Sequence, residues 1–149
     1  MERDCLVCRE IAGEIELPGG PLWGDELVLG FHAPPLAEIG EPRPYLGHLL
    51  VVPRRHAPGL GDVTDEEAAR LGVVLARLSR ALRSLEEVER VYSAVVGNHS
   101  PHLHVHLFPR YRGTPPEVAW IDVEDWDGAA RGGATEIAEL VERLRGLLG

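Results

Sequence analysis

Three histidines alternate with apolar residues in the segment HLHVHLF, where they occupy positions His102, His104 and His106. If this segment is a β-strand, side chains two positions apart lie on the same face of it. Packing alone gives no reason to align three imidazoles, because each ring has polar nitrogens that need partners. A neutral imidazole can attack phosphorus as a nucleophile, or it can bind zinc as a ligand. The spacing by itself does not decide between these two chemistries.

The only two cysteines of the chain, Cys5 and Cys8, are three positions apart near its start. Such a pair is half of a tetrahedral zinc site, which two imidazoles would complete. A redox dithiol normally belongs to a thioredoxin-like βαβ unit, for which the sequence has no pattern, and a disulfide is rare in the cytoplasm. Half of a zinc site is therefore the preferred interpretation, with two unreactive thiols as the alternative.

The distribution of charge favours a small anionic ligand over a nucleic acid. The 149 residues carry a net charge of −9, which disfavours general nucleic-acid binding because that binding requires a basic surface. Residues 42–61 and 91–116 nevertheless contain no acidic residue and hold several histidines and arginines. Two such segments indicate a local site for an anion, although buried strands would also be poor in acidic residues.

The N-terminal segment MERDCLVCREIAGE is charged throughout and has no apolar run of the kind found in secretory signals. The longest apolar runs have the length of strands, so no membrane-spanning helix is expected. We therefore expect a cytoplasmic protein without a membrane partner.

The length and composition are typical of one globular domain covering residues 1–149. The clearest element is a helix over residues 64–85, where Thr64 and Glu67 form a capping box and leucines recur every three or four positions. Further patterns predict strands at Glu26–Phe31, His48–Val52, Arg90–Val96 and His102–Phe108, and a second helix from Thr135. This order predicts an α+β fold with two main helices on one side of a sheet.

Three motifs occur in order between residues 5 and 110. The histidine segment fits His-φ-His-φ-His-φ-φ, where φ is apolar, and is followed by Pro-Arg. Upstream, GHLLVVPRRH at residues 47–56 fits Gly-His-x-Leu-Val-x-Pro-x-x-His. CLVCREIAGEI at residues 5–15 resembles Cys-x-x-Cys-x-x-Ile-x-x-Gly-x-Ile, with one residue fewer between Ile11 and Gly13. Together these motifs resemble those of the histidine-triad family, and three in the right order are far more specific than one.

The resemblance implies a single antiparallel sheet and a nucleotidyl hydrolase or transferase acting on an α-phosphate. His104 would attack phosphorus and carry the nucleotidyl group, while His106 would orient the site and help to protonate the leaving group. Transferase relatives tend to carry glutamine at the third histidine, so His106 favours a hydrolase. The implied substrates are dinucleoside polyphosphates or nucleoside phosphoramidates.

The resemblance also implies a structural zinc ion and a homodimer. In zinc-bearing relatives the matching metal ligands are those at Cys5, Cys8, His56 and His102, and no metal is needed for the attack itself. Family members pair through a helix and an adjoining strand. The helix over residues 64–85 is the candidate here, because its small residues Ala68, Gly72 and Ala76 allow close approach.

The sequence departs from the family pattern at two places that contact the substrate in relatives. A shortened loop precedes the triad, in which Asn98 and Ser100 are the expected phosphate donors and His99 is a candidate substrate contact. Many relatives carry Phe-x-Asp after the early strand, and that carboxylate holds the ribose hydroxyls. Here the corresponding residues are Phe31-His32-Ala33, so this acid is missing.

Two other functions stay open at this stage. The three triad histidines would be catalytic ligands in a zinc-dependent hydrolase. Alternatively, the fold would serve as a nucleotide-binding regulatory module with little turnover. His48, at the start of a predicted strand, is interpreted as a hydrogen-bonded structural residue and not as a ligand.

Overall fold

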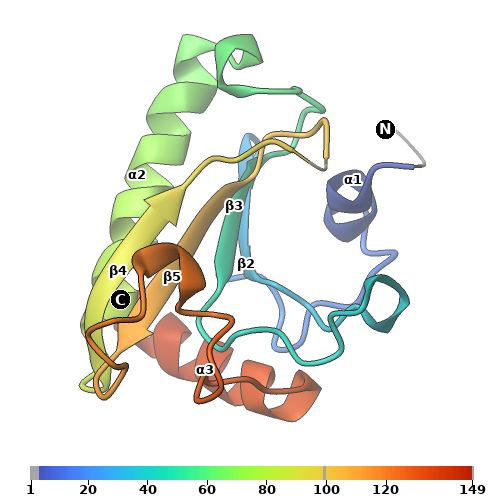
Figure 1. The fold of residues 1–149 in the computed structure, drawn as a ribbon. Coiled ribbons are helices and arrows are strands. Elements are labelled where there is room, and N and C mark those ends of the chain that lie inside the picture. The colour runs from blue at the N-terminus through green and yellow to red at the C-terminus, as the bar shows by residue number, and fades with distance from the viewer. Residues whose placement is uncertain (1–3, 99, 149) are drawn as a thin grey trace.

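A five-stranded antiparallel sheet forms the centre of the computed structural model, which describes residues 4–98 and 100–148 (Figure 1). The strands lie in the order β1-β2-β3-β5-β4. Their bounds are β1 Trp23–Gly24, β2 Val28–His32, β3 Leu49–Pro53, β4 Val88–Ala94 and β5 Val105–Tyr111, and the helices are α1 Leu6–Ile11, α2 Asp65–Arg83 and α3 Ala134–Leu148. The predicted α+β fold with an antiparallel sheet and two main helices is confirmed.

The helix α2 begins where the capping box predicted it. The Thr64 hydroxyl accepts a hydrogen bond from the Glu67 N–H at 3.1 Å, and the Glu67 carboxylate accepts one from the Thr64 N–H at 2.8 Å. These two bonds satisfy amides that have no partner within the helix. Beyond the cap, Leu71, Val74 and Leu78 recur at helical spacing and are buried against the sheet.

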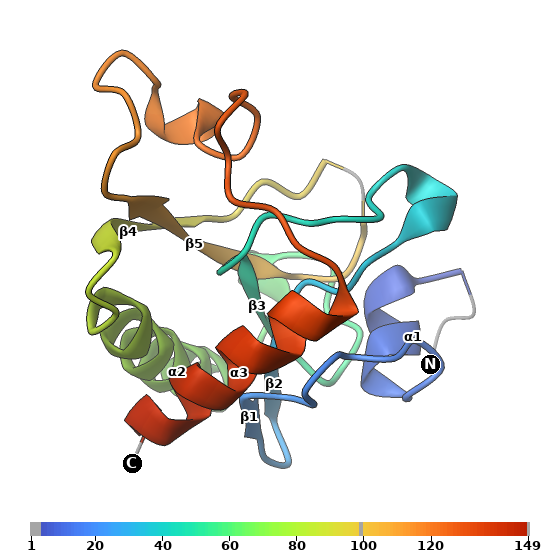
Figure 2. The same ribbon diagram turned by 90° about the horizontal axis from the view of Figure 1, so that it is seen from below.

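The two faces of the sheet are covered differently (Figure 2). Leu49 and Val51 of β3 pack in the core beneath α2 and α3. The next residue along, Val52, lies on the other face, because side chains alternate along a strand, and it packs with Val7 of α1. The sequence did not predict α1, and this short helix leaves part of its face of the sheet free for a cavity.

The triad strand begins later than predicted. β5 starts at Val105, which pairs with Val51, and the expected start at His102 is wrong by three residues. Pairing with β3 stops there because Pro53 has no N–H to donate. Residues 102–104 turn toward the segment after β3 instead, where the Leu103 N–H donates to the Ala57 carbonyl at 2.7 Å. The neighbouring strand β4 is likewise displaced by two residues from its expected range.

The connection between β5 and α3 folds back across the end of the sheet. Tyr45 and Arg131 form an isolated antiparallel bridge, and the Tyr45 hydroxyl donates to the Pro109 carbonyl at 2.8 Å. At Gly47 the backbone passes so close to Pro109 that an added Cβ would lie 2.6 Å from a side-chain carbon of Pro109. The φ angle of Gly47 is +94°. Only glycine fits both demands, which explains the Gly-His start of this strand motif.

In the part of the chain that the structure describes, no helix has the length and hydropathy needed to cross a membrane.

We expect Thr64→Ala to lower the free energy of unfolding by about 1 kcal/mol, because the Glu67 N–H loses its acceptor. Urea unfolding followed by circular dichroism would measure the change. Thr135→Ala is the matched control, since Thr135 is exposed in the first turn of α3 and its loss should change the value by less than about 0.5 kcal/mol. Equal losses in both variants would contradict the capping role.

Candidate active site and metal cluster

A cavity of about 640 Å³ opens on the face of the sheet that carries α1. Its floor includes Leu50 of β3 and His106 of β5, and His104 lies beside them. The remaining lining comes from α1, from the segments at residues 33–45 and 100–101, and from the loop that carries Glu124. The cavity therefore collects side chains from most of the chain around two of the three triad histidines.

The hydrogen bond made by His104 determines which of its nitrogens can react. Nδ1 lies 2.8 Å from the backbone carbonyl oxygen of His102. A carbonyl oxygen can only accept, so Nδ1 carries the proton and Nε2 of the neutral ring keeps its lone pair. The His104 ring lies 4.9 Å from that of His106, centroid to centroid. The neutral form of His104 thus has an unprotonated Nε2, and the ring lines the cavity.

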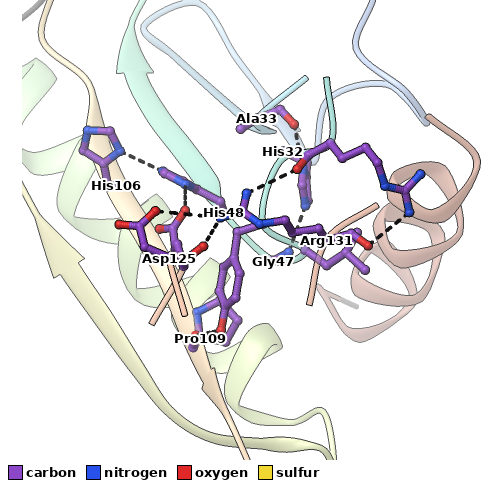
Figure 3. Close-up of polar contacts among 12 residues, drawn as sticks. His32, Ala33, Gly47, His48, His106, Pro109, Asp125 and Arg131 are labelled. Carbon is purple, nitrogen blue, oxygen red and sulfur yellow. Dashed lines mark hydrogen bonds and ion pairs between the residues drawn. The ribbon is translucent and has the colours of Figure 1, made fainter. Parts of the chain in front are cut away.

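His106 is linked through His48 to a carboxylate (Figure 3). His48 Nδ1 lies 2.8 Å from Glu124 Oε1, and His48 Nε2 lies 2.8 Å from His106 Nδ1. The carboxylate can only accept, so the proton of neutral His48 is on Nδ1. His48 Nε2 must then accept the hydrogen bond from His106 Nδ1–H. The neutral His106 ring therefore has an unprotonated Nε2. Burial, with smaller contributions from His48 and His104, lowers the pKa of His106 to about 4. His106 is therefore neutral at neutral pH in the protein without substrate.

His32 supports the backbone that carries His48. It is buried, its Nδ1 donates to the Ala33 carbonyl at 2.8 Å, and its Nε2 accepts from the Gly47 N–H at 2.9 Å. Burial lowers the pKa of His32 to about 4, so it stays neutral and keeps both bonds. The ring thereby ties the end of β2 to the residue that precedes His48.

Four predicted metal ligands lie close together: Cys5, Cys8, His56 and His102, whose ligand atoms are all within 4.8 Å of one another. His102 Nδ1 is 3.5 Å from Cys5 Sγ and 3.4 Å from Cys8 Sγ, and His56 Nδ1 is 3.3 Å from Cys8 Sγ. Zinc–sulfur and zinc–nitrogen bonds in a tetrahedron would place such pairs roughly 3.5 Å apart. The donor set and its spacing therefore fit one zinc ion.

His102 is oriented toward this cluster by its other nitrogen. Its Nε2 lies 2.7 Å from the Pro53 carbonyl oxygen and so carries the proton, which leaves the Nδ1 lone pair facing the two thiols. The triad is thus divided: His102 joins the cysteines, while His104 and His106 line the cavity.

Comparison with known proteins agrees with this geometry. The HIT domain family matches residues 42–113. "Protein hit" of Bacillus subtilis is 30% identical over 115 residues, which cover 72% of this chain and 72% of that protein. This chain belongs to the HIT (histidine triad) family.

Two further HIT-related proteins bear on the site. A solved Zn-bound histidine triad family protein from Mycobacterium smegmatis aligns with 97% of this chain and 93% of its own, with a TM-score of 0.69 and 24% identity, which shows a common fold. The AP-4-A phosphorylase of Mycobacterium tuberculosis is 33% identical over 111 residues, covering 68% of this chain and 50% of that protein.

The structure separates the three predicted substrate contacts of this HIT protein. Ser100 lines the cavity, and its hydroxyl oxygen is buried without a hydrogen-bond partner among the described residues. Asn98 is exposed and is not among the residues that line the cavity. His99 lies outside the described residues.

Sequence reasoning missed Glu124 altogether. It is 76 residues from His48 in an irregular segment rich in acidic residues, so no spacing or motif distinguishes it. The interpretation of His48 as a hydrogen-bonded residue agrees with the structure, which also places it on the cavity wall between Glu124 and His106.

Proposed function

We propose that this HIT protein hydrolyses nucleotides at the α-phosphate through a covalent nucleotidyl intermediate on His104. The observation that carries the proposal is the hydrogen bond from His104 Nδ1 to the His102 carbonyl, which leaves Nε2 free to attack within the cavity. The similarity to a protein named AP-4-A phosphorylase supports a nucleotide substrate. Dinucleoside polyphosphates and nucleoside phosphoramidates are the proposed substrate classes.

In the first step the Nε2 lone pair of His104 forms a bond to phosphorus, and the bond to the leaving group breaks. An anionic phosphate next to His106 favours its protonated form, because an opposite charge raises the pKa of an imidazole. His106 then gives this proton to the leaving group as it departs with the electron pair. The Ser100 hydroxyl, which has no partner among the described residues, would donate to a phosphate oxygen.

In the second step water attacks the nucleotidyl–His104 bond from the opposite side. The new bond joins the water oxygen to phosphorus, and the electron pair of the phosphorus–nitrogen bond returns to Nε2 of His104. His106, now neutral, accepts the proton of the water as a general base. The positive charge that forms twice on His106 is compensated by Glu124 through His48.

We expect His104→Ala to reduce turnover by at least roughly a thousandfold while nucleotide binding stays close to that of the wild type, because the covalent route is lost. His106→Ala should cost on the order of a hundredfold. Steady-state assays on a dinucleoside polyphosphate and a phosphoramidate would measure both, with acid-quench trapping of the adduct. Near wild-type turnover by His104→Ala would refute the mechanism, and nucleotide binding by the wild type without any adduct or turnover would favour the regulatory alternative.

The same assay in ¹⁸O-labelled water, with and without inorganic phosphate, identifies the acceptor. Hydrolysis predicts one labelled oxygen in the nucleoside monophosphate, whether or not phosphate is present. An unlabelled nucleoside diphosphate that forms only with phosphate would assign a phosphorylase instead.

We expect Glu124→Gln to lower kcat about tenfold and leave KM nearly unchanged. The amide oxygen still accepts from His48, but the charge that strengthens this hydrogen bond is lost. The acidic limb of the kcat pH profile should also move, which a purely structural role would not cause. Asp125→Asn is the matched control, because Asp125 is exposed and contacts Arg131 at 3.7 Å. An equal loss in both variants would contradict the role of Glu124.

The cluster of Cys5, Cys8, His56 and His102 is proposed to hold one structural zinc ion, as the spacing of its donor atoms supports. Zinc bound there would stabilise the fold and supply no reactive water, since four protein ligands complete a tetrahedron. Its ligands would join α1 to the end of β3 and to the start of the triad. The division of the triad favours this role over a catalytic metal on all three histidines.

Protein purified without chelators should contain close to one zinc ion per chain by elemental analysis. Replacing both cysteines by alanine should abolish the binding and lower the melting temperature, because metal binds only the folded state. His104→Ala serves as the control and should keep its zinc. Zinc retained by the double cysteine variant but lost from His104→Ala would favour the catalytic-metal alternative.

A homodimer is proposed through α2 and the edge strand β4. Ala68, Gly72 and Ala76 are exposed on one side of α2, and β4 pairs only with β5 in the described sheet. Light scattering at micromolar concentration should give about twice the chain mass of 16.3 kDa. A single species at the chain mass would exclude this assembly. The cytoplasmic location and the absence of a nucleic-acid partner stay predictions.

A further inference from the structure

Glu10 of α1 is a buried acidic residue that lines the cavity. Its exposed fraction is 3%, and it accepts no side-chain hydrogen bond from any residue that the structure describes. Removing a carboxyl group from water without a partner costs free energy, so buried polar groups are nearly always paired. Glu10 lines the cavity that contains His104 and His106. An unpaired group in this position indicates a partner supplied by the ligand.

Glu10 differs in burial from the other carboxyl groups of the cavity. Asp4 and Glu41 also line it, but both are exposed. Leu6, Val7, Ala33 and Leu36 contribute apolar lining, and no arginine is among the described lining residues. Glu10 is therefore the buried carboxyl group among them.

The segments that carry Glu10 and His104 meet at the cluster of cysteines and histidines. Cys8 precedes Glu10 by two residues, and His102 precedes His104 by two residues. Cys8 Sγ and His102 Nδ1 are 3.4 Å apart. The side chains of Glu10 and His104 therefore line one cavity from two segments that are in contact through Cys8 and His102.

We infer that Glu10 binds the vicinal hydroxyls of a ribose whose 5′-phosphate lies at His104. This inference rests on the proposed function and names a residue that selects ribonucleotides. A carboxylate has two acceptor oxygens, and the ribose diol presents two donors on adjacent carbons. The Ser100 hydroxyl, which also lines the cavity and has no partner among the described residues, can donate to phosphate. The two unpaired groups thus match the two polar parts of a ribonucleoside phosphate in kind.

Equilibrium binding of three probes would test the inference: AMP, 2′-deoxy-AMP and 3′-deoxy-AMP, measured by calorimetry on the zinc-loaded protein. The wild type should bind AMP about tenfold to a hundredfold more tightly than either deoxynucleotide, the usual effect of a hydrogen bond to a charged group. Glu10→Met, which has similar length and no acceptor oxygen, should bind all three alike. Glu14→Gln is the control and should keep the wild-type preference, because Glu14 is exposed and does not line the cavity.

Melting curves, a second variant and a comparison of AMP with IMP distinguish the possible outcomes. Melting curves must show that Glu10→Met is folded, and Glu10→Gln, which retains one acceptor oxygen, should show an intermediate preference. Wild-type protein that binds AMP and both deoxynucleotides equally would overturn the inference, even if His104-dependent turnover is observed. A Glu10-dependent preference without turnover would support the inference and refute the proposed hydrolysis. Loss of discrimination between AMP and IMP in Glu10→Met, with sugar preference intact, would assign Glu10 to the base and overturn the inference.

Discussion

The buried imidazole of His102 is the interaction on which the site depends. Its Nε2 donates to the Pro53 carbonyl, its Nδ1 faces the two thiols, and its own backbone carbonyl accepts from His104. A single residue thus links the end of β3, the N-terminal helix and His104. Because each of these bonds fixes the next proton, the tautomer of His104 follows from the position of His102.

A second constraint is the neutrality of the buried histidines. Burial lowers the pKa of both His32 and His106 to about 4, so neither carries a charge in the resting protein. Neutral imidazoles can both donate and accept, and the chain from Glu124 through His48 to His106 requires both capacities. The carboxylate lies at the far end of this chain, where it can stabilise a transient positive charge without protonating His106 in advance.

The cavity lies on one face of the sheet, the face that carries α1. The large helices α2 and α3 bury the opposite face and provide most of the core, whereas the short α1 leaves space beside it. Residues that would be costly in a core, including Glu10, Ser100 and His48, line this space together. The polar groups without protein partners therefore lie where a ligand can satisfy them.

The sequence by itself determined the helix α2 and the alternation of the sheet, which follow from local rules: a cap and a periodicity. The cysteine pair alone predicted half of a zinc site, and the resemblance to the histidine-triad family added His56 and His102, which the structure brings together with the cysteines. The sequence pattern placed the start of β5 three residues too early. The pairing between β3 and β5 ends at Val51 and Val105, and this end depends on Pro53, a residue of the other strand.

Only the tertiary structure decided how the triad is divided and which acids reach it. His102 turns to the cysteines because the Pro53 carbonyl takes its other nitrogen, and no alternation along a strand predicts that. Glu124 and Glu10 are two among 24 acidic residues, without a motif to distinguish them. Their proposed roles depend on burial and on proximity across long stretches of chain, and those properties exist only after the sheet, α1 and the C-terminal connection have packed together.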